Sequence, residues 1–203
     1  MPKVRAFFFA AFMAMLSAQS LAADYAVVRA RIDEAAVFEG RFVQSERLVH
    51  AQKLFECHGY FIFKPDDVLF WRTQTPVLTT SVYNDREFKT FIYVNNARIE
   101  NSSTPTTNVI NRILWSLLSD GDTSLELDFN IQIHFEDDQW QMDLYPITTA
   151  MLSVVKRVTV IGGSFVQQIQ IESYSNDFTT LTLSDIERFP VLSTRQERDL
   201  ANP

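Results

Sequence analysis

The chain has little cysteine, glycine or proline. Cys57 is the single cysteine, so no disulfide can form within the chain. Its thiol is expected either to be a small buried apolar group or, in an oxidising compartment, to pair with another chain. Five glycines and seven prolines are too few for a low-complexity segment. One folded domain is therefore expected.

Motifs for catalysis and for metal binding are also missing. The three histidines, His50, His58 and His134, lack a zinc-ligand spacing, and no G-x-S-x-G elbow is present. Acidic residues at 66–67 and 136–138 fall in predicted turns, where solvation explains them. The sequence therefore argues against a hydrolase, and we expect neither an enzyme nor a cofactor or metal.

Positive charge is scarce as well. The formal net charge of the chain is −7, and nucleic-acid binding needs a basic stripe. Tight docking on anionic lipid headgroups is disfavoured for the same reason. A charge of this sign keeps a protein soluble and repels its copies, so we expect a monomer that does not bind nucleic acid.

The first 22 residues have the pattern of a secretory signal. Lys3 and Arg5 precede an uncharged apolar stretch over residues 6–16, and small residues up to Ala22 suit cleavage before Ala23. The alternative is a membrane anchor, but a spanning helix needs about 20 apolar residues. No cysteine follows the cleavage point to accept a lipid. We expect residues 1–22 to be a signal peptide and 23–203 to be one periplasmic domain of charge −9, because Lys3 and Arg5 are removed.

Beyond the signal the apolar period is mostly two, as expected for β-strands. The clearest case is 125–135, where apolar residues such as Leu125, Leu127 and Phe129 alternate with polar ones. We predict about 11 strands, nearly all joined by antiparallel turns, one of them at Asn95–Asn96. The predicted strands are 37–48, 54–63, 69–73, 78–83, 88–94, 97–100, 125–135, 139–144, 154–161, 164–172 and 178–183.

Helical signals are few. Residues 24–36 have helical spacing of apolar side chains. Thr104 and Pro105 offer an N-cap and a first-turn proline for a helix that runs to about Leu118, before a stop at residues 120–121. A shorter turn follows Pro146. The tail from Glu187 is polar and is expected to fray.

A large sheet with so few helices must split into a sandwich or curl around its own interior. The helix predicted at 105–118 is apolar round more than half its circumference, which favours a plug beside a gap. We therefore predict a mainly β (α+β) fold: an incomplete antiparallel β-barrel with a lid or plug of short helices around an apolar cavity. The alternative is that the same apolar residues fill a packed core.

Several motifs resemble those of the LolA family of periplasmic lipoprotein carriers. Phe38-x-x-x-Phe42-x-Gln44 is similar to the family's opening signature. Gly59, a break at Lys64–Pro65, Trp71 and Pro76 follow in the family's order. The later hairpins, with Gly162–Gly163 and the ending at 179–185, resemble a branch associated with glycolipid or pigment-lipid export. The resemblance covers residues 24–186.

This resemblance implies a function and a set of partners. A carrier of this family shields the acyl chains of a lipoprotein or lipid between an inner-membrane exporter and an outer-membrane acceptor, without catalysis. Lys64 stands where the family has an arginine that latches the lid, and lysine lacks the guanidinium's fork of donors. The side chains expected to line the lipid-binding cavity or the lid contact are Phe42, Phe61, Phe63, Trp71, Ile113, Leu114, Leu117, Phe129, Ile131, Trp140 and Met142.

A second interpretation remains open for the same cavity. The chain could be an envelope adaptor that senses lipid or binds a partner without transport. Such sensors usually carry a second domain, and the residues after the signal leave no room for one, which favours the carrier.

Overall fold

The computed structural model describes residues 24–32, 34–84, 88–94, 97–101, 105–119 and 124–203. Its strands form one 11-stranded sheet in the order β6-β5-β4-β3-β2-β1-β11-β10-β9-β8-β7. The strand pairings are all antiparallel within the described residues, and the sheet is not closed into a barrel, as predicted. The strands are β1 Val37–Leu48, β2 Lys53–Lys64, β3 Val68–Thr75, β4 Thr79–Tyr83, β5 Phe88–Val94, β6 Ala97–Asn101, β7 Phe129–Glu136, β8 Gln139–Pro146, β9 Arg157–Gly162, β10 Val166–Glu172 and β11 Phe178–Phe189.

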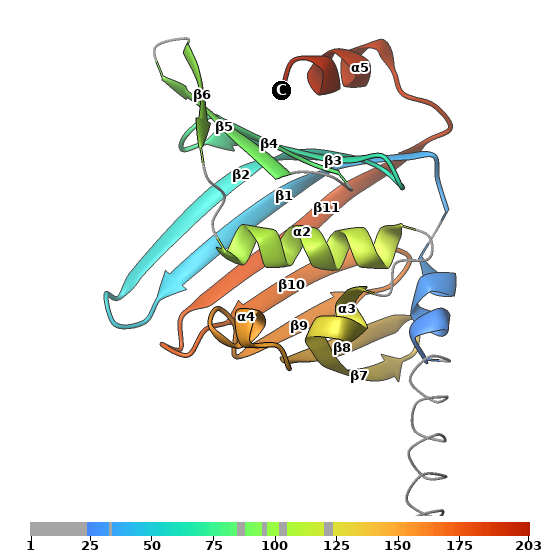
Figure 1. Ribbon diagram of the computed structural model, residues 1–203. Coiled ribbons are helices and arrows are strands. Elements are labelled where there is room, and N and C mark those ends of the chain that lie inside the picture. The colour runs from blue at the N-terminus through green and yellow to red at the C-terminus, as the bar shows by residue number, and fades with distance from the viewer. Residues whose placement is uncertain (1–23, 33, 85–87, 95–96, 102–104, 120–123) are drawn as a thin grey trace, which may run out of the picture.

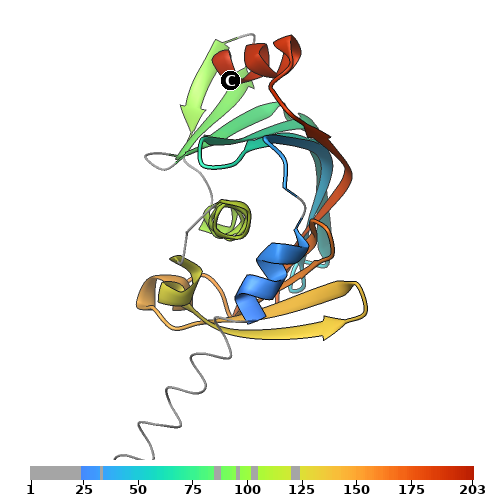
Figure 2. The same ribbon diagram turned by 90° about the vertical axis from the view of Figure 1, so that its right-hand side faces the viewer.

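The chain builds this sheet in two halves. β1 to β6 form one meander and β7 to β11 form the other, and the pairing of β1 with β11 joins them. The two edge strands, β6 and β7, lie at opposite ends of the sheet, although they are close in sequence. The chain therefore has to cross from one edge to the other, and α2 (Pro105–Leu118) makes this crossing on the concave side. Figure 2 shows the sheet curled around α2.

Alternation along the strands gives the sheet a nearly dry inner face. Phe38, Phe61, Phe63 and Leu69 are 0–2% exposed and belong to one large apolar cluster with α2. The turns at Asn95–Asn96 and 120–121 and the proposed N-cap Thr104 lie outside the described residues. The α2 bounds agree with the predicted helix.

Three segments were predicted wrongly, and the first two lie before the C-terminal tail. Residues 124–128 form a short helix, α3 (Ser124–Asp128), in place of the first half of a strand. Leu125 is fully buried but Leu127 is 70% exposed, so the two leucines do not share a face as a strand requires. The N-terminal helix covers residues 24–31 and is shorter than predicted.

The C-terminal tail does not fray. β11 extends to Phe189, and residues Thr194–Ala201 form α5, whose N-cap Ser193 and Gln196 make a capping box. A short helix α4, Thr149–Leu152, follows β8 and is capped by Thr148. The tail is ordered because it has both a cap and a surface to pack on.

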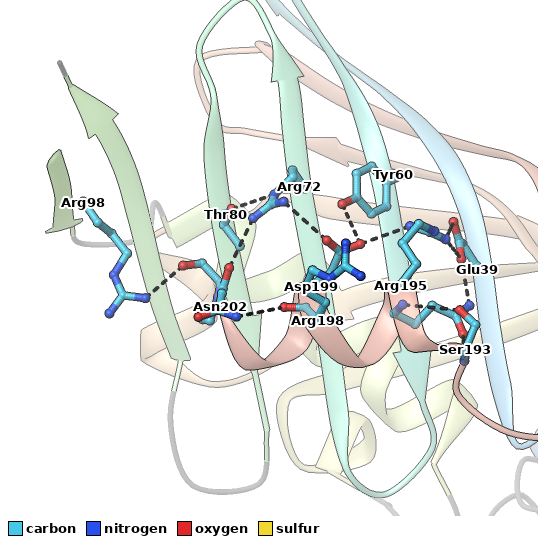
Figure 3. A network of polar contacts seen from close by, with 12 residues as sticks. Glu39, Tyr60, Arg72, Thr80, Arg98, Ser193, Arg195, Arg198, Asp199 and Asn202 are labelled. Atoms are coloured by element: carbon cyan, nitrogen blue, oxygen red, sulfur yellow. Dashed lines mark hydrogen bonds and ion pairs between the residues drawn. The ribbon is translucent and has the colours of Figure 1, made fainter. Parts of the chain in front are cut away.

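That surface is the outer face of β1 to β3, opposite α2 (Figure 1). Val37, Ile62 and Phe70 form a second apolar cluster there, against which Leu192 and Leu200 pack. Figure 3 shows the polar network around it: Asp199 accepts hydrogen bonds from Tyr60 and Arg195 and lies 3.6 Å from Arg72. Arg195 also pairs with Glu39. These strands are thus covered on both faces, which explains their continuous apolar runs.

Candidate functional site

Helix α2 fills most of the hollow of the sheet. Pro105 suits the first helical turn, and the apolar residues after it recur at helical spacing. Ile113, Leu114 and Leu117 are 0–2% exposed and pack into the large cluster. Asn111 and Ser116, both polar, are fully buried on the same helix. Polar groups in such a place need partners, and these partners show how the helix is held.

One buried hydrogen bond ties the middle of α2 to the sheet. The indole Nε1 of Trp71, on β3, donates to Oδ1 of Asn111 at 2.9 Å. Trp71 is 7% exposed and its ring contacts those of Phe42 and Phe61, with centroids 5.0 and 5.3 Å apart. The amide nitrogen of Asn111 has no hydrogen-bond partner among the described residues.

Further polar contacts hold the second half of α2. The hydroxyl of Tyr25, on the N-terminal helix, donates to the carbonyl of Ser116 at 3.1 Å. Arg112 lies 2.6 Å from the carboxylate of Asp128 at the end of α3. The amide of Asp66 donates to the hydroxyl of Ser119 at 3.4 Å. These contacts join α2 to three separate segments.

An open cleft of about 290 Å³ lies between α2 and the sheet, and we call it the inner cleft. Its apolar wall comes from β1, β3, β11 and α2, and its polar wall comes mainly from hydroxyls of β3, β4 and β5. None of the described residues that line it is charged. The lining is Phe42, Gln44, Cys57, Trp71, Thr73, Pro76, Val77, Thr79, Ser81, Thr90, Ile92, Thr107, Ile110, Asn111 and Leu181.

A second cleft of about 570 Å³ opens near the C-terminal end of α2, and we call it the end cleft. It separates α2 from the segment that leads from the N-terminal helix into β1. Its lining is Arg29, Ala30, Ile32, Glu34, Ala35, Ala36, Phe38, Pro65, Leu117 and Leu118.

The eleven side chains expected to line a cavity all lie in the large apolar cluster, at most 7% exposed. Phe42 and Trp71 line the inner cleft, and Leu117 lines the end cleft. The other eight contact neighbouring apolar groups in a packed interior. The structure therefore combines the two sequence interpretations: a mostly filled core with α2 as its plug, and open space beside the plug.

Lys64 does not contact α2 through any described polar contact. Its ammonium pairs with Asp67 of its own turn at 2.5 Å, with 41% of the lysine side chain exposed. The same turn still reaches the end of α2 through Asp66 and Ser119. The buried contact of Trp71 with Asn111 was not predicted, although Asn111 stands out as a polar residue among apolar neighbours.

Cys57 lies on the inner face of β2 at the inner cleft. Burial raises the pKa of its thiol above the ordinary value of 9.0, while a backbone hydrogen bond at Gln44 and the charges of Glu56 and Glu46 act more weakly. A thiol of raised pKa is a poor nucleophile at neutral pH. This supports the apolar interpretation of Cys57 over a reactive one.

The described part of the chain holds no cluster of three metal-ligating side chains. Within the same residues, no helix combines the length and apolar character needed to cross a bilayer. The candidate site consists of the apolar interior with α2 and the two clefts beside it.

No protein-family model matches the chain, and no curated protein matches its sequence. A solved structure of MucB is similar over 87% of this chain and 62% of MucB, with a TM-score of 0.50 and 10% identity. The chain has the fold of the matched part of MucB. It spans about six-tenths of the length of MucB, which is also solved in complex with MucA(peri).

Two further solved structures are similar with lower scores. One is the LolA superfamily protein NE2245 from Nitrosomonas europaea, with a TM-score of 0.46, 7% identity, and coverage of 85% of this chain and 94% of that one. The other is a putative outer membrane lipoprotein-sorting protein domain from Vibrio parahaemolyticus, with a TM-score of 0.47, 7% identity, and coverage of 88% and 96%. The predicted architecture, an incomplete antiparallel barrel with a helical plug, is confirmed by the open sheet and the position of α2.

Proposed function

We propose that this protein is a periplasmic carrier that shields the acyl chains of a lipoprotein or lipid between α2 and the concave sheet. The observation that carries the proposal is the position of α2: an apolar helix that fills the hollow of an open sheet with clefts beside it. An acyl chain has the same apolar character as the side chains that α2 presents, so it can take the place of α2 against the sheet.

The energetics suit a carrier that must release its load. Transfer of an acyl chain into an apolar site gains about 0.8 kcal/mol per CH₂, so about 15 methylenes gain roughly 12 kcal/mol. That value alone corresponds to about nanomolar binding. Moving α2 away from part of its apolar contacts with the sheet opposes this gain. The net affinity then falls into a range that allows release.

The proposal assigns the eleven residues predicted to line the cavity to the surface that an acyl chain meets once α2 moves. Phe42 and Trp71 are the first of these, since they already line the inner cleft. Lys64 keeps its proposed role at the lid only through its turn, which reaches Ser119. An inner-membrane exporter and an outer-membrane acceptor complete the proposed route, and the signal pattern of residues 1–22 supports the periplasm.

The decisive experiment is lipid extraction from the protein purified out of a native envelope. We expect a chain-bearing amphiphile in about equimolar amount by mass spectrometry. The loaded protein is then mixed with acceptor vesicles, and transfer of the amphiphile is followed with time. Protein that emerges free of lipid and binds no acyl probe would contradict the proposal.

A second candidate is an adaptor that binds an envelope partner. Apolar side chains at the tip of the β1–β2 hairpin favour it, because Leu54 is 66% exposed and Phe55 is 51% exposed. Such groups often mark a surface that another molecule covers. In the same purification, a lipid-free protein that retains one stoichiometric partner would support the adaptor.

A further inference from the structure

The amide nitrogen of Asn111 is buried on α2 and has neither a hydrogen-bond partner nor an ion-pair partner among the described residues. The residue is 0% exposed and lines the inner cleft. Its Oδ1 accepts from Trp71, while its Nδ2 has no partner among the described residues. Buried amide groups are nearly always satisfied, so an unsatisfied one calls for a partner, such as a water or a ligand atom.

The orientation of this amide follows from the chemistry of its partner. An indole N–H is a donor only, so it must face the oxygen of Asn111 and not the nitrogen. Trp71 thereby fixes Nδ2 as a donor that is available to a third group. The complementary group is a hydrogen-bond acceptor.

The lining of the inner cleft narrows the kind of acceptor. Phe42, Ile110 and Leu181 offer an apolar wall, whereas Thr73 and Thr79 are among the hydroxyl residues opposite. Among the described lining residues none carries a charge, so a carboxylate would be desolvated there without a cation from these residues. A neutral carbonyl attached to hydrocarbon matches both the wall and the free donor.

We propose that Asn111 donates its Nδ2 hydrogen to the ester or amide carbonyl of an acyl chain bound in the inner cleft. This inference rests on the proposed function and specifies its ligand: an acyl ester or amide, in preference to a free fatty acid or an alkyl ether. Trp71 is a positioning residue, because it holds the amide in the donating orientation.

The test compares 1-palmitoylglycerol with its ether analogue, 1-O-hexadecylglycerol, by displacement of a fluorescent alkyl probe from the full chain. We expect the wild-type protein to prefer the ester by about tenfold, the scale of one good hydrogen bond. Asn111→Leu should abolish the preference and leave ether binding within about twofold. Asn108→Leu, the same change at an exposed position of α2, should leave the preference intact.

A double variant guards against a failure to fold. Asn111→Leu with Trp71→Phe removes both partners of the buried bond and leaves no new unpaired donor; it should also show no preference. Equal wild-type binding of the two lipids, tighter binding of palmitate than of the ester, or a preference that survives Asn111→Leu would overturn the inference while the carrier stands. If neither lipid binds the wild-type protein, the proposed function itself fails.

Discussion

Gly59 shows how a single missing side chain shapes the floor of the candidate site. It pairs with Phe42 of β1 in the sheet register. A Cβ at Gly59 would lie 2.0 Å from the carbonyl oxygen of Arg72 and 2.8 Å from the Phe42 ring. The ring of Phe42 therefore lies across the glycine and reaches Trp71, so the aromatic wall of the inner cleft depends on this position.

We expect Gly59→Ala to lower the free energy of unfolding by about 1–3 kcal/mol, the usual cost of overpacking. The melting temperature should fall by about 3–10 °C, as measured by circular dichroism. Gly163→Ala is the matched control, because the nearest atom to its added Cβ is 3.4 Å away, at ordinary contact distance. Equal melting temperatures for the two variants would contradict this account of Gly59.

Cys57 offers a natural reporter of occupancy. Burial raises its thiol pKa above 9.0, so the thiolate fraction stays small at neutral pH and grows only as the pH rises through that raised pKa. Alkylation by iodoacetamide should be slow near pH 7 and should accelerate above about pH 9. A bound acyl ester should slow it further, since Cys57 lines the inner cleft.

Mass spectrometry at timed intervals measures this alkylation, and the protein unfolded in urea provides the unprotected rate. Fast alkylation of the folded protein at neutral pH would show that the thiol is not held in an apolar site. A rate unchanged by ligand would place the acyl chain elsewhere.

At the scale of elements, α5 covers the outer face of β1 to β3, on the side of the sheet away from the proposed lipid site. Truncation after Ser193 removes Leu200 and exposes Val37, Ile62 and Phe70. We expect a loss of about 2–4 kcal/mol, a melting temperature lower by about 5–15 °C, and stronger binding of the dye ANS. Acyl binding should persist, because α2 packs on the other face.

Glu197→Ala is the control for this truncation, as Glu197 is exposed on the same helix. If the truncated protein lost acyl binding but kept its melting temperature, the result would be the opposite of the expected one. It would show that part of the binding site lies on the outer face of the sheet.

The elements also show what the sequence could predict. The helix at 105–118 was predicted correctly because proline opens it and its apolar spacing is helical. The same reasoning predicted a strand where residues 124–128 form a helix. Leu125, Leu127 and Phe129 alternate with polar residues by chance, and tertiary contacts decide the local structure. Arg112, far from this segment in sequence, pairs with Asp128 and fixes the end of α3. No local pattern contains that contact.

Helix α5 was missed for a related reason. It is rich in charge and lacks an apolar stripe, so the periodicity used for other helices is absent. The S-x-x-Q pattern of Ser193 and Gln196 was the signal that could have located it. Likewise, Asn111 could be seen as an odd polar residue, but its partner Trp71 is 40 residues away.

At the scale of the whole molecule, the proposed carrier works by exchanging one apolar occupant for another. On addition of 1-palmitoylglycerol we expect amide hydrogens of α2 to exchange faster with solvent, because the lipid takes over part of the apolar contacts between the helix and the sheet. The amide exchange rates of β1 to β3 should fall or stay the same. Hydrogen exchange with mass spectrometry measures the exchange rates of α2 and of β1 to β3. The comparison is the Asn111→Leu variant with 1-O-hexadecylglycerol. Slower exchange of α2 on binding would mean that the ligand adds to the packed interior without displacing the helix.

Helix α2 lies in the chain between the two edge strands, β6 and β7. It can therefore shift but cannot separate from the sheet. A ligand that displaces α2 would pull on β6 and β7 together, and these strands lie at opposite edges of the sheet. Ligand binding in the interior would thus change the edge strands on the surface. A partner protein that binds either edge strand would be able to distinguish the ligand-bound protein from the ligand-free one.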